Sequence, residues 1–300
     1  MSAKPLVAVL GLGTMGAGMA HRLLGAGFPL KLFNRSPERY RSFEGTAAQL
    51  CKSPTEAATG ADVVISMVSD DDVSRAIWQG PAGALSAVSP GAILIESSTL
   101  SLGWVRQLAE LSRSRDCHFL DAPVTGSKDQ AEAGTLKFLV GGDVLPIKWA
   151  TPVFRAMGVD IVPLGTVGSG TILKLVNNFI CGVQVAALAE GLAVLSRFDL
   201  DQDAALNVLV KGAVSSPLVQ TILARVAAGN FAPNFSVALI EKDLAYAIRE
   251  AAEVGVDLMS GESARVRFQQ AQGGGIGDQD ISSLVKWLRE PPHFNDARAQ

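Results

Sequence analysis

Short apolar runs alternate with amphipathic stretches along the first half of the chain. The run Leu6–Leu10, for example, ends directly at a glycine, and runs of this kind are typical of strands buried in a parallel sheet. The amphipathic stretches between them predict crossover helices, so the sequence indicates an α/β fold with a mostly parallel sheet covered on both faces. The expected strands span residues 6–10, 30–33, 62–67, 92–95, 117–120, 136–140 and 159–162, and the expected helices span residues 14–25, 37–43, 71–78, 104–112 and 145–157.

The pattern changes after Pro163–Ser169, a joint rich in glycine and proline. Residues 172–198 carry apolar side chains almost all round, and a helix that is apolar on every side is expected to be buried on every side, as a spine between two domains or two subunits. Shorter helices are expected over residues 202–211, 217–228, 236–254, 258–270 and 280–289. The sequence therefore predicts an α/β domain over residues 1–165 and an all-helical domain over residues 166–300.

Composition narrows the class of protein. Of the 300 residues, 48% are hydrophobic and 18% charged, and the net charge is −3, so the chain can bury a large core and global disorder is excluded. No basic stripe indicates nucleic-acid binding, and we expect neither a nucleic-acid nor a membrane partner. The three cysteines form no CxxC motif and the histidines show no metal-ligand spacing, so we expect no metal site, no disulfide framework and a cytoplasmic location.

A glycine loop follows the first expected strand and opens the first expected helix. Its residues, Gly11, Leu12, Gly13, Thr14, Met15 and Gly16, have the spacing GxGxxG. The first glycine permits the tight turn, the second lets a pyrophosphate approach the backbone, and the third lets helix and strand pack closely. Unpaired N–H groups at the helix start then face the phosphates, so the loop predicts dinucleotide binding; the alternative is a glycine-rich turn without a ligand.

The end of the second expected strand distinguishes between cofactors. An acidic residue there would accept a hydrogen bond from the ribose 2′-hydroxyl of NAD, but this chain has Asn34, Arg35 and Ser36. Arg35 can pair with a 2′-phosphate, and its neighbours can donate hydrogen bonds to it. The sequence therefore favours NADP(H), with NAD(H) as a second cofactor; the alternative is a solvated arginine before a helix start.

Four motifs at family-like distances resemble the β-hydroxyacid dehydrogenases, over about residues 6–289. They are Gly11–Gly16, Asp121-Ala122-Pro123-Val124-Thr125-Gly126, Gly168-Ser169-Gly170 with Lys174 and Asn177-Asn178, and Lys242-Asp243. The family includes 3-hydroxyisobutyrate dehydrogenase and glyoxylate/succinic semialdehyde reductase and, more distantly, 6-phosphogluconate dehydrogenase. The resemblance implies a Rossmann-like dinucleotide-binding domain followed by a helical domain for substrate binding and for assembly into a homodimer or homotetramer.

The resemblance also implies a role for each matching residue. It makes Lys174 the catalytic acid/base, places Thr125 and Gly126 at the substrate carboxylate, and has Asn178 orient the reacting oxygen. It places Met67, Val68, Ser69, Thr99 and Lys242 at the cofactor. The family usually has Ser-Gly-Gly where this chain has Thr125-Gly126-Ser127, which adds a methyl group to the pocket. Ser127 followed by Lys128 is closer to the glyoxylate/succinic semialdehyde reductase branch, and the substrate stays open.

Side-chain chemistry supports the same assignment independently. Lys174 and Asn178 are four residues apart on an expected helix, so they share one face. A lysine on an otherwise apolar helix is costly to bury charged, and its pKa is expected to fall from about 10.4, which suits a proton donor to an alkoxide. The alternatives are a lysine whose amine extends from a core helix to water and, for Lys242-Asp243, a solvated charge cluster.

Two other functions share this architecture. An imine reductase typically lacks the catalytic lysine, and a non-catalytic dinucleotide-binding scaffold has no need of Lys174 with Asn178. The sequence therefore predicts an NAD(P)-dependent oxidoreductase, with NADPH preferred, that interconverts a small hydroxyacid and its aldehyde or keto acid by hydride transfer.

Overall fold

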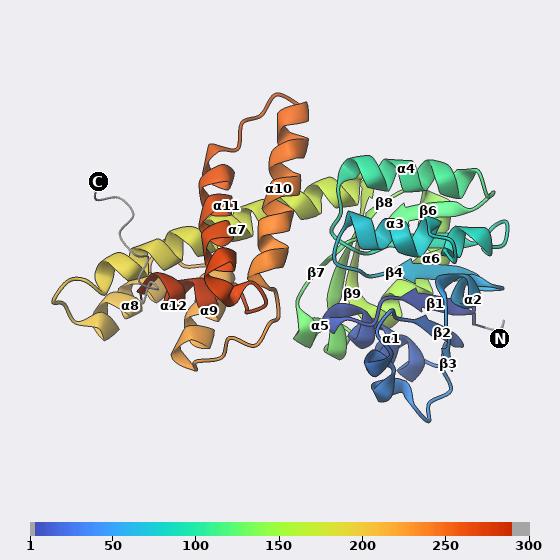
Figure 1. Cartoon of the computed structure of the whole chain (residues 1–300), viewed down its shortest axis with the longest axis horizontal. Coiled ribbons are helices and arrows are strands. Elements are labelled where there is room, and N and C mark those ends of the chain that lie inside the picture. Colours follow the sequence, from blue (N-terminus) through green and yellow to red (C-terminus); the bar gives the residue numbers. More distant parts are fainter. Residues whose placement is uncertain (1–3, 290–300) are drawn as a thin grey trace. The chain divides into compact units, whose positions relative to one another are not determined.

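The computed structural model describes residues 4–289 of the chain (Figure 1). The chain divides into two compact units, residues 1–174 and residues 175–300. The family-like motifs before the joint and the first turn of the long helix that follows it therefore belong to the first unit. Each unit is described by itself.

Unit 1 is built on one nine-stranded sheet, with the strand order β3-β2-β1-β4-β5-β6-β8-β7 and with β9 paired to β8. Pairs among β3, β2, β1, β4, β5 and β6 are parallel, whereas β8 is antiparallel to β6 and β7 and parallel to β9. The strands are β1 (Val7–Leu10), β2 (Leu30–Phe33), β3 (Gln49–Leu50), β4 (Val63–Ser66), β5 (Ile93–Glu96), β6 (His118–Asp121), β7 (Val124–Thr125), β8 (Leu136–Gly141) and β9 (Gly158–Gly165). The prediction of a mostly parallel Rossmann-like sheet is confirmed.

Helices cover both faces of this sheet (Figure 1). Alternate residues of β1 face opposite sides: Val7 and Val9 belong to one buried cluster, whereas Ala8 and Leu10 belong to another. Side chains of α1 and α6 fill the first cluster, and those of α3 and α4 fill the second. The helices of this unit are α1 (Thr14–Gly25), η1 (Pro37–Phe43), α2 (Pro54–Ala58), α3 (Asp71–Gln79), η2 (Ala84–Ser86), α4 (Leu102–Arg113), α5 (Lys128–Ala133) and α6 (Val144–Met157).

Unit 2 is helical, as predicted, and in its described part Ser236 and Asp280 make an isolated β-bridge outside any named strand. Its core joins α7, α9, α10, α11 and α12 through buried side chains such as Leu192, Ile240 and Phe268. The elements are α7 (Ser169–Leu195), whose first turns lie in unit 1, then α8 (Gln202–Lys211), α9 (Pro217–Ala227), α10 (Val237–Glu253), α11 (Met259–Ala271), the π-turn η3 (Gln272–Ile276) and α12 (Ser283–Arg289).

The structure differs from the sequence expectations in several elements. Residues 37–43 form a 3-10 helix, and the short elements β3, α2, η2, β7, α5 and η3 were not expected because a few residues carry no clear periodicity. The last helix begins at Ser283 rather than at residue 280, because the backbone N–H groups of Asp280 and Ile281 donate to the carbonyl oxygens of Phe231 and Phe235. The domain boundary at 165/166 stays a prediction.

Helix α7 is not buried on every side by its own chain. Ile172, Leu173, Val176 and Ile180 are between 37% and 56% exposed, and Val194 is 57% exposed. Among the described residues, α7 is also a helix whose length and hydropathy would suffice to cross a membrane, although the core helix of a soluble protein passes the same test. The packing within the described chain therefore does not account for all of its apolar surface.

Candidate functional site

Most of the predicted site residues of unit 1 follow the carboxyl ends of its strands. Because β1, β2, β4, β5 and β6 are parallel, these ends share one edge of the sheet. The order β3-β2-β1-β4-β5-β6 reverses its direction at β1 and β4, and open α/β sheets bind ligands at such a switch point. The residues at this edge are Gly11–Gly16 after β1, Asn34–Ser36 after β2, Met67–Ser69 after β4, Thr99 after β5 and Thr125-Gly126 beyond β6.

The three glycines of the loop after β1 have distinct surroundings. Gly11 has a φ of +101°, and a Cβ there would lie 2.3 Å from the carbonyl oxygen of Met67. A Cβ on Gly16 would lie 2.0 Å from the carbonyl oxygen of Gly11, whereas nothing lies within 4 Å of a Cβ on Gly13. Gly11 and Gly16 thus close the turn, and Gly13 caps α1 with open space beside it. This arrangement fits a pyrophosphate at the N-terminus of α1.

Asn34 ties the second strand to the glycine loop. Its Oδ1 accepts a hydrogen bond from the Leu12 N–H at 2.8 Å, and its Nδ2 donates to the Ser36 carbonyl oxygen at 3.0 Å. Its backbone N–H donates to the Tyr40 hydroxyl at 2.8 Å. The amide of Asn34 is therefore engaged by the chain itself, whereas the Arg35 side chain is exposed and available to a phosphate.

A buried carboxylate connects the loops after β4 and β5. Glu96, which is 1% exposed, accepts hydrogen bonds from the Ser74 hydroxyl at 2.8 Å, the Trp78 indole N–H at 2.9 Å and the Ser98 N–H at 3.0 Å. The Ser98 hydroxyl accepts from the Val68 N–H at 2.8 Å. The predicted cofactor segments at Val68 and Thr99 are thus held through one buried group.

Burial raises the pKa of the Glu96 carboxyl, and the hydrogen bonds from Ser98, Trp78 and Ser74 oppose that rise. Glu96 was not among the residues expected from the sequence. Its signal was weak, because a lone acidic residue at a strand end is also common on solvated surfaces. Asp70, after β4, caps α3 by accepting a hydrogen bond from the Val73 N–H at 2.9 Å.

The predicted carboxylate-binding segment runs from the end of β6 to the start of α5. Thr125 is half-buried and Gly126 is exposed with a φ of +120°. The Ser127 N–H and hydroxyl both donate to Gln130 Oε1, at 2.8 and 2.6 Å, so Ser127 caps a helix that was not expected from the sequence. Ser127 is thereby occupied structurally, which leaves Thr125 as the hydroxyl of this segment suited to a ligand.

Asp121 opens the same segment and is fully buried. Burial raises the pKa of its carboxyl, and hydrogen bonds from Gly168 and Thr171 oppose that rise. Gly168 directly precedes α7, and Thr171 lies in the first turn of this helix, three residues before Lys174. The sequence motif includes Asp121, but the sequence predicted a role only for Thr125 and Gly126 of that motif.

Asn178 and Lys242, assigned to different roles by the sequence, meet at one carboxylate in unit 2. Asn178 is 3% exposed, and its Nδ2 donates to Asp243 Oδ2 at 2.6 Å. The Lys242 ammonium lies 2.9 Å from the other oxygen of Asp243, which is itself 2% exposed. Lys174, half-buried, precedes Asn178 by one turn of α7. The alternative of a solvated Lys242-Asp243 cluster does not fit this burial.

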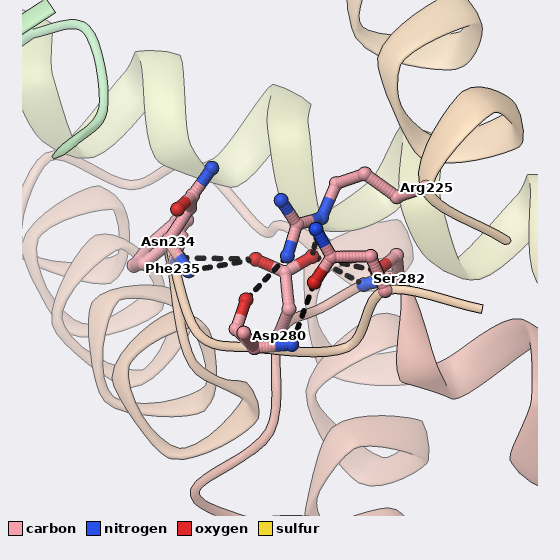
Figure 2. Close-up of polar contacts among 7 residues, drawn as sticks. Arg225, Asn234, Phe235, Asp280 and Ser282 are labelled. Atoms are coloured by element: carbon pink, nitrogen blue, oxygen red, sulfur yellow. Dashed lines mark hydrogen bonds and ion pairs between the residues drawn. The ribbon is translucent and has the colours of Figure 1, made fainter. Parts of the chain in front are cut away.

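Another buried carboxylate of unit 2, that of Asp280, fixes the loop that leads into α10, the helix of Lys242. Asp280 accepts from the N–H groups of Asn234 at 3.1 Å and Phe235 at 3.2 Å, and from Arg225 Nε at 3.1 Å. It also accepts from the Ser282 hydroxyl at 2.7 Å; Figure 2 shows these contacts converging on one side chain. The first turn of α10 is therefore anchored to the loop before α12.

The described residues contain no group of three or more histidine, cysteine, aspartate or glutamate side chains that could hold a metal ion. Trp78 and Trp104 are both fully buried. They also donate hydrogen bonds, Trp78 to Glu96 and Trp104 to the Ser74 hydroxyl at 2.9 Å.

Comparison with known proteins places the chain in a defined group. Residues 6–166 match the family described as the NAD-binding domain of 6-phosphogluconate dehydrogenase, and residues 168–288 match the family described as NAD-binding of NADP-dependent 3-hydroxyisobutyrate dehydrogenase. The chain is 30% identical to L-threonate dehydrogenase of Cupriavidus necator, over 93% of this chain and 95% of that protein.

Solved structures agree with this grouping. Mycobacterium tuberculosis 3-hydroxyisobutyrate dehydrogenase, solved with L-serine, is 32% identical, with a TM-score of 0.84 over 95% of this chain and 99% of that chain. An imine reductase from Pseudomonas sp. is 22% identical with a TM-score of 0.55, over 94% of this chain and 99% of that chain. The latter likeness concerns the fold alone.

Proposed function

This chain belongs to the NAD(P)-dependent β-hydroxyacid dehydrogenase family, and on that premise we propose that it reduces a small aldehyde or keto acid with NADPH, and oxidises the corresponding hydroxyacid, with Lys174 as the proton-transferring group. The observation that carries this proposal is Lys174 one helical turn before Asn178, whose amide is fixed by the buried Asp243. The surrounding residues of α7 are mostly apolar, so Lys174 is the ionisable side chain that the first turns of this helix offer for proton transfer.

The cofactor preference rests on the loop after β2. With Asn34 engaged by Leu12 and Ser36, the exposed guanidinium of Arg35 is the charged group offered to the ribose, and it suits a 2′-phosphate better than a 2′-hydroxyl. No carboxylate of Asn34–Ser36 repels that phosphate. NAD(H) is accommodated as the weaker cofactor.

The chain's own residues then have separable tasks. A bound nicotinamide cofactor supplies the hydride that adds to the carbonyl carbon. The Lys174 ammonium donates a proton to the carbonyl oxygen, which becomes the product hydroxyl, and the neutral amine regains a proton from water. Thr125 and the backbone at Gly126 hold the substrate carboxylate, and Asn178 orients the reacting oxygen or the lysine.

The exposed stripe on α7 supports a homodimer or homotetramer built on the helical unit. Four exposed apolar residues form this stripe: Leu173, Val176, Ile180 and Val194. They are three, four and fourteen residues apart, close to whole numbers of helical turns. The exposed residues Ala187 and Gly191 lie between Ile180 and Val194. Small residues within an apolar stripe allow two helices to approach closely, and a self-complementary patch of this kind suits a two-fold interface. A cytoplasmic location remains part of the proposal.

One parallel assay tests the proposed function. NADPH consumption is measured with glyoxylate, succinic semialdehyde and a cyclic imine, and NADP+ reduction with 3-hydroxyisobutyrate and L-threonate. We expect turnover on at least one acid substrate, ranked by kcat/KM. Turnover on the imine alone would identify an imine reductase instead, and tight NADPH binding without turnover on any substrate would identify a dinucleotide-binding scaffold.

A further inference from the structure

Both oxygens of the Asp121 carboxylate are occupied by the start of α7. Oδ1 accepts a hydrogen bond from the Gly168 N–H at 2.7 Å. Oδ2 accepts from the Thr171 N–H at 2.8 Å and from the Thr171 hydroxyl at 2.9 Å. Thr171 is 2% exposed and Asp121 is fully buried, so these three bonds form away from water, where an unsatisfied partner is costly.

Three glycines make this contact sterically feasible. A Cβ on Gly141 would lie 2.3 Å from Asp121 Oδ1, and a Cβ on Gly170 would lie 2.1 Å from the carbonyl oxygen of Leu139. Gly168 has a φ of +97°, which favours glycine. Because these glycines carry no side chain, the backbone at the first turn of α7 lies directly against the carboxyl ends of β6 and β8.

Two predicted parts of the active site meet at this carboxylate. Asp121 begins the segment that reaches Thr125 and Gly126, and Thr171 precedes Lys174 by three residues of α7. Three residues of α-helix rise about 4.5 Å, less than one turn, so a shift of Thr171 is transmitted to Lys174 with little room for relaxation.

We infer that Asp121 is a positioning residue that fixes the helical turn of Lys174 against the segment that binds the substrate carboxylate. The inference rests on the proposed function. It assigns Asp121 no contact with substrate or cofactor. The carboxylate of Asp121 is required because the three donors are shared between its two oxygens. An asparagine would offer a single acceptor oxygen, and its N–H groups would face one of the donors.

The test compares Asp121→Asn with the matched pair Thr171→Val and Thr171→Ser. For each variant, kcat, the Kd of NADPH and amide hydrogen exchange of a peptide covering residues 166–176 are measured. For Asp121→Asn we expect faster exchange in that peptide and a kcat lowered by about 10–100-fold, the loss typical of a misplaced catalytic group. The Kd of NADPH should change less than about threefold, because the phosphates bind at the glycine loop.

The threonine pair keeps the test decisive if Asp121→Asn folds poorly. Thr171→Val removes the hydroxyl donor and keeps the shape, so it should lower kcat and speed exchange, whereas Thr171→Ser keeps the donor and should lose less of both. Leu85→Ala serves as the stability control. Leu85 is a buried side chain of η2, an element that packs against α2 and α3, and its loss should leave exchange of 166–176 unchanged.

The outcomes separate this inference from the proposed function. Faster exchange of residues 166–176 with an unchanged kcat would overturn the positioning role. Unchanged exchange in Asp121→Asn would show that the hydrogen bonds to Asp121 do not hold the start of α7. An unmutated protein that binds NADPH but turns over none of the acid substrates would overturn the proposed function, and with it any role of Asp121 in that reaction.

Discussion

The Asn178 amide donates to Asp243 Oδ2 at 2.6 Å, with both side chains almost fully buried. Because a carboxylate only accepts, this contact fixes which end of the amide faces Asp243: Nδ2 points to the carboxylate, and Oδ1 accepts from Asn177 at 3.0 Å. The orientation of a residue on α7 is thus set by a charge on α10.

Asn178→Asp would place two carboxylates against each other at this point. Like charges raise the pKa of such a pair, so the cost is absent below the ordinary aspartate pKa of about 3.9 and grows as pH rises through the raised pKa. We expect a loss of about 2–3 kcal/mol at neutral pH, equivalent to about two pKa units, measured by thermal unfolding from pH 4 to 7. Asn207→Asp, at an exposed position of α8, is the control; equal behaviour of the two variants would contradict the contact.

We expect the exposed guanidinium of Arg35 to set the cofactor preference. We expect NADPH to bind more tightly than NADH by about 1–3 kcal/mol, the range for a charge-assisted hydrogen-bonded pair. Arg35→Ala should remove most of that difference by weakening NADPH alone, as measured by fluorescence titration of both cofactors. Arg115→Ala, at the amino edge of the sheet just before β6, should preserve the difference. Equal dissociation constants in the unmutated protein would refute the preference.

The Glu96 network predicts a pH-dependent stability. Burial raises the pKa of Glu96 above its ordinary value of 4.5, so its contribution to stability is fully present below pH 4.5 and is lost as pH rises through the raised pKa. The unfolding free energy of the unmutated protein relative to Glu96→Gln should therefore fall with rising pH. The fall should be about 1.4 kcal/mol for every tenfold difference in proton affinity between the folded and unfolded states.

Ser74→Ala should strengthen the pH dependence that Glu96→Gln removes. It removes a donor that stabilises the ionised Glu96, so its stability should fall more steeply with rising pH than that of the unmutated protein. A difference between unmutated protein and Glu96→Gln that stays constant from pH 4.5 to 8 would show that Glu96 does not titrate as the buried network requires.

The sequence predicted the main strands and long helices of unit 1 well, because most of these strands are short, mainly apolar runs, such as Val7–Leu10 and Val63–Ser66. The glycine loop was predicted equally well from its spacing. In the structure Gly11 and Gly16 pack against backbone atoms, whereas Gly13 has open space beside it. Short elements such as α5 were missed, because Ser127 and Gln130 form a capping contact that occupies only four residues.

The buried carboxylates were beyond sequence reasoning for a different reason. Asp121, Glu96 and Asp280 each collect donors from segments that are distant along the chain: Asp121 accepts from Thr171 and Asp280 from Arg225. Such pairings depend on which strand and helix ends meet in space. No spacing or periodicity within one segment encodes them.

The apolar stripe on α7 predicts the assembly. We expect a dimer or tetramer by light scattering at micromolar concentration, and Ile180→Asp should reduce the mass to that of a monomer because it buries a charge in the interface. Ile180 is 56% exposed in the single chain, so the variant should still fold. Leu145→Asp, at a similarly exposed apolar position on α6, should leave the assembly intact. A monomeric unmutated protein would contradict the interface.

Turnover by Lys174→Ala tests the central claim most directly, with NADPH binding and Lys174→Arg measured beside it. If Lys174 donates the proton, kcat should fall by about 10²–10⁴-fold while the Kd of NADPH barely changes, since the glycine loop holds the phosphates. Lys174→Arg should not restore turnover, because a guanidinium keeps its proton at working pH. A Lys174→Ala protein with near-normal kcat would mean that another group or water supplies the proton, and would contradict the account.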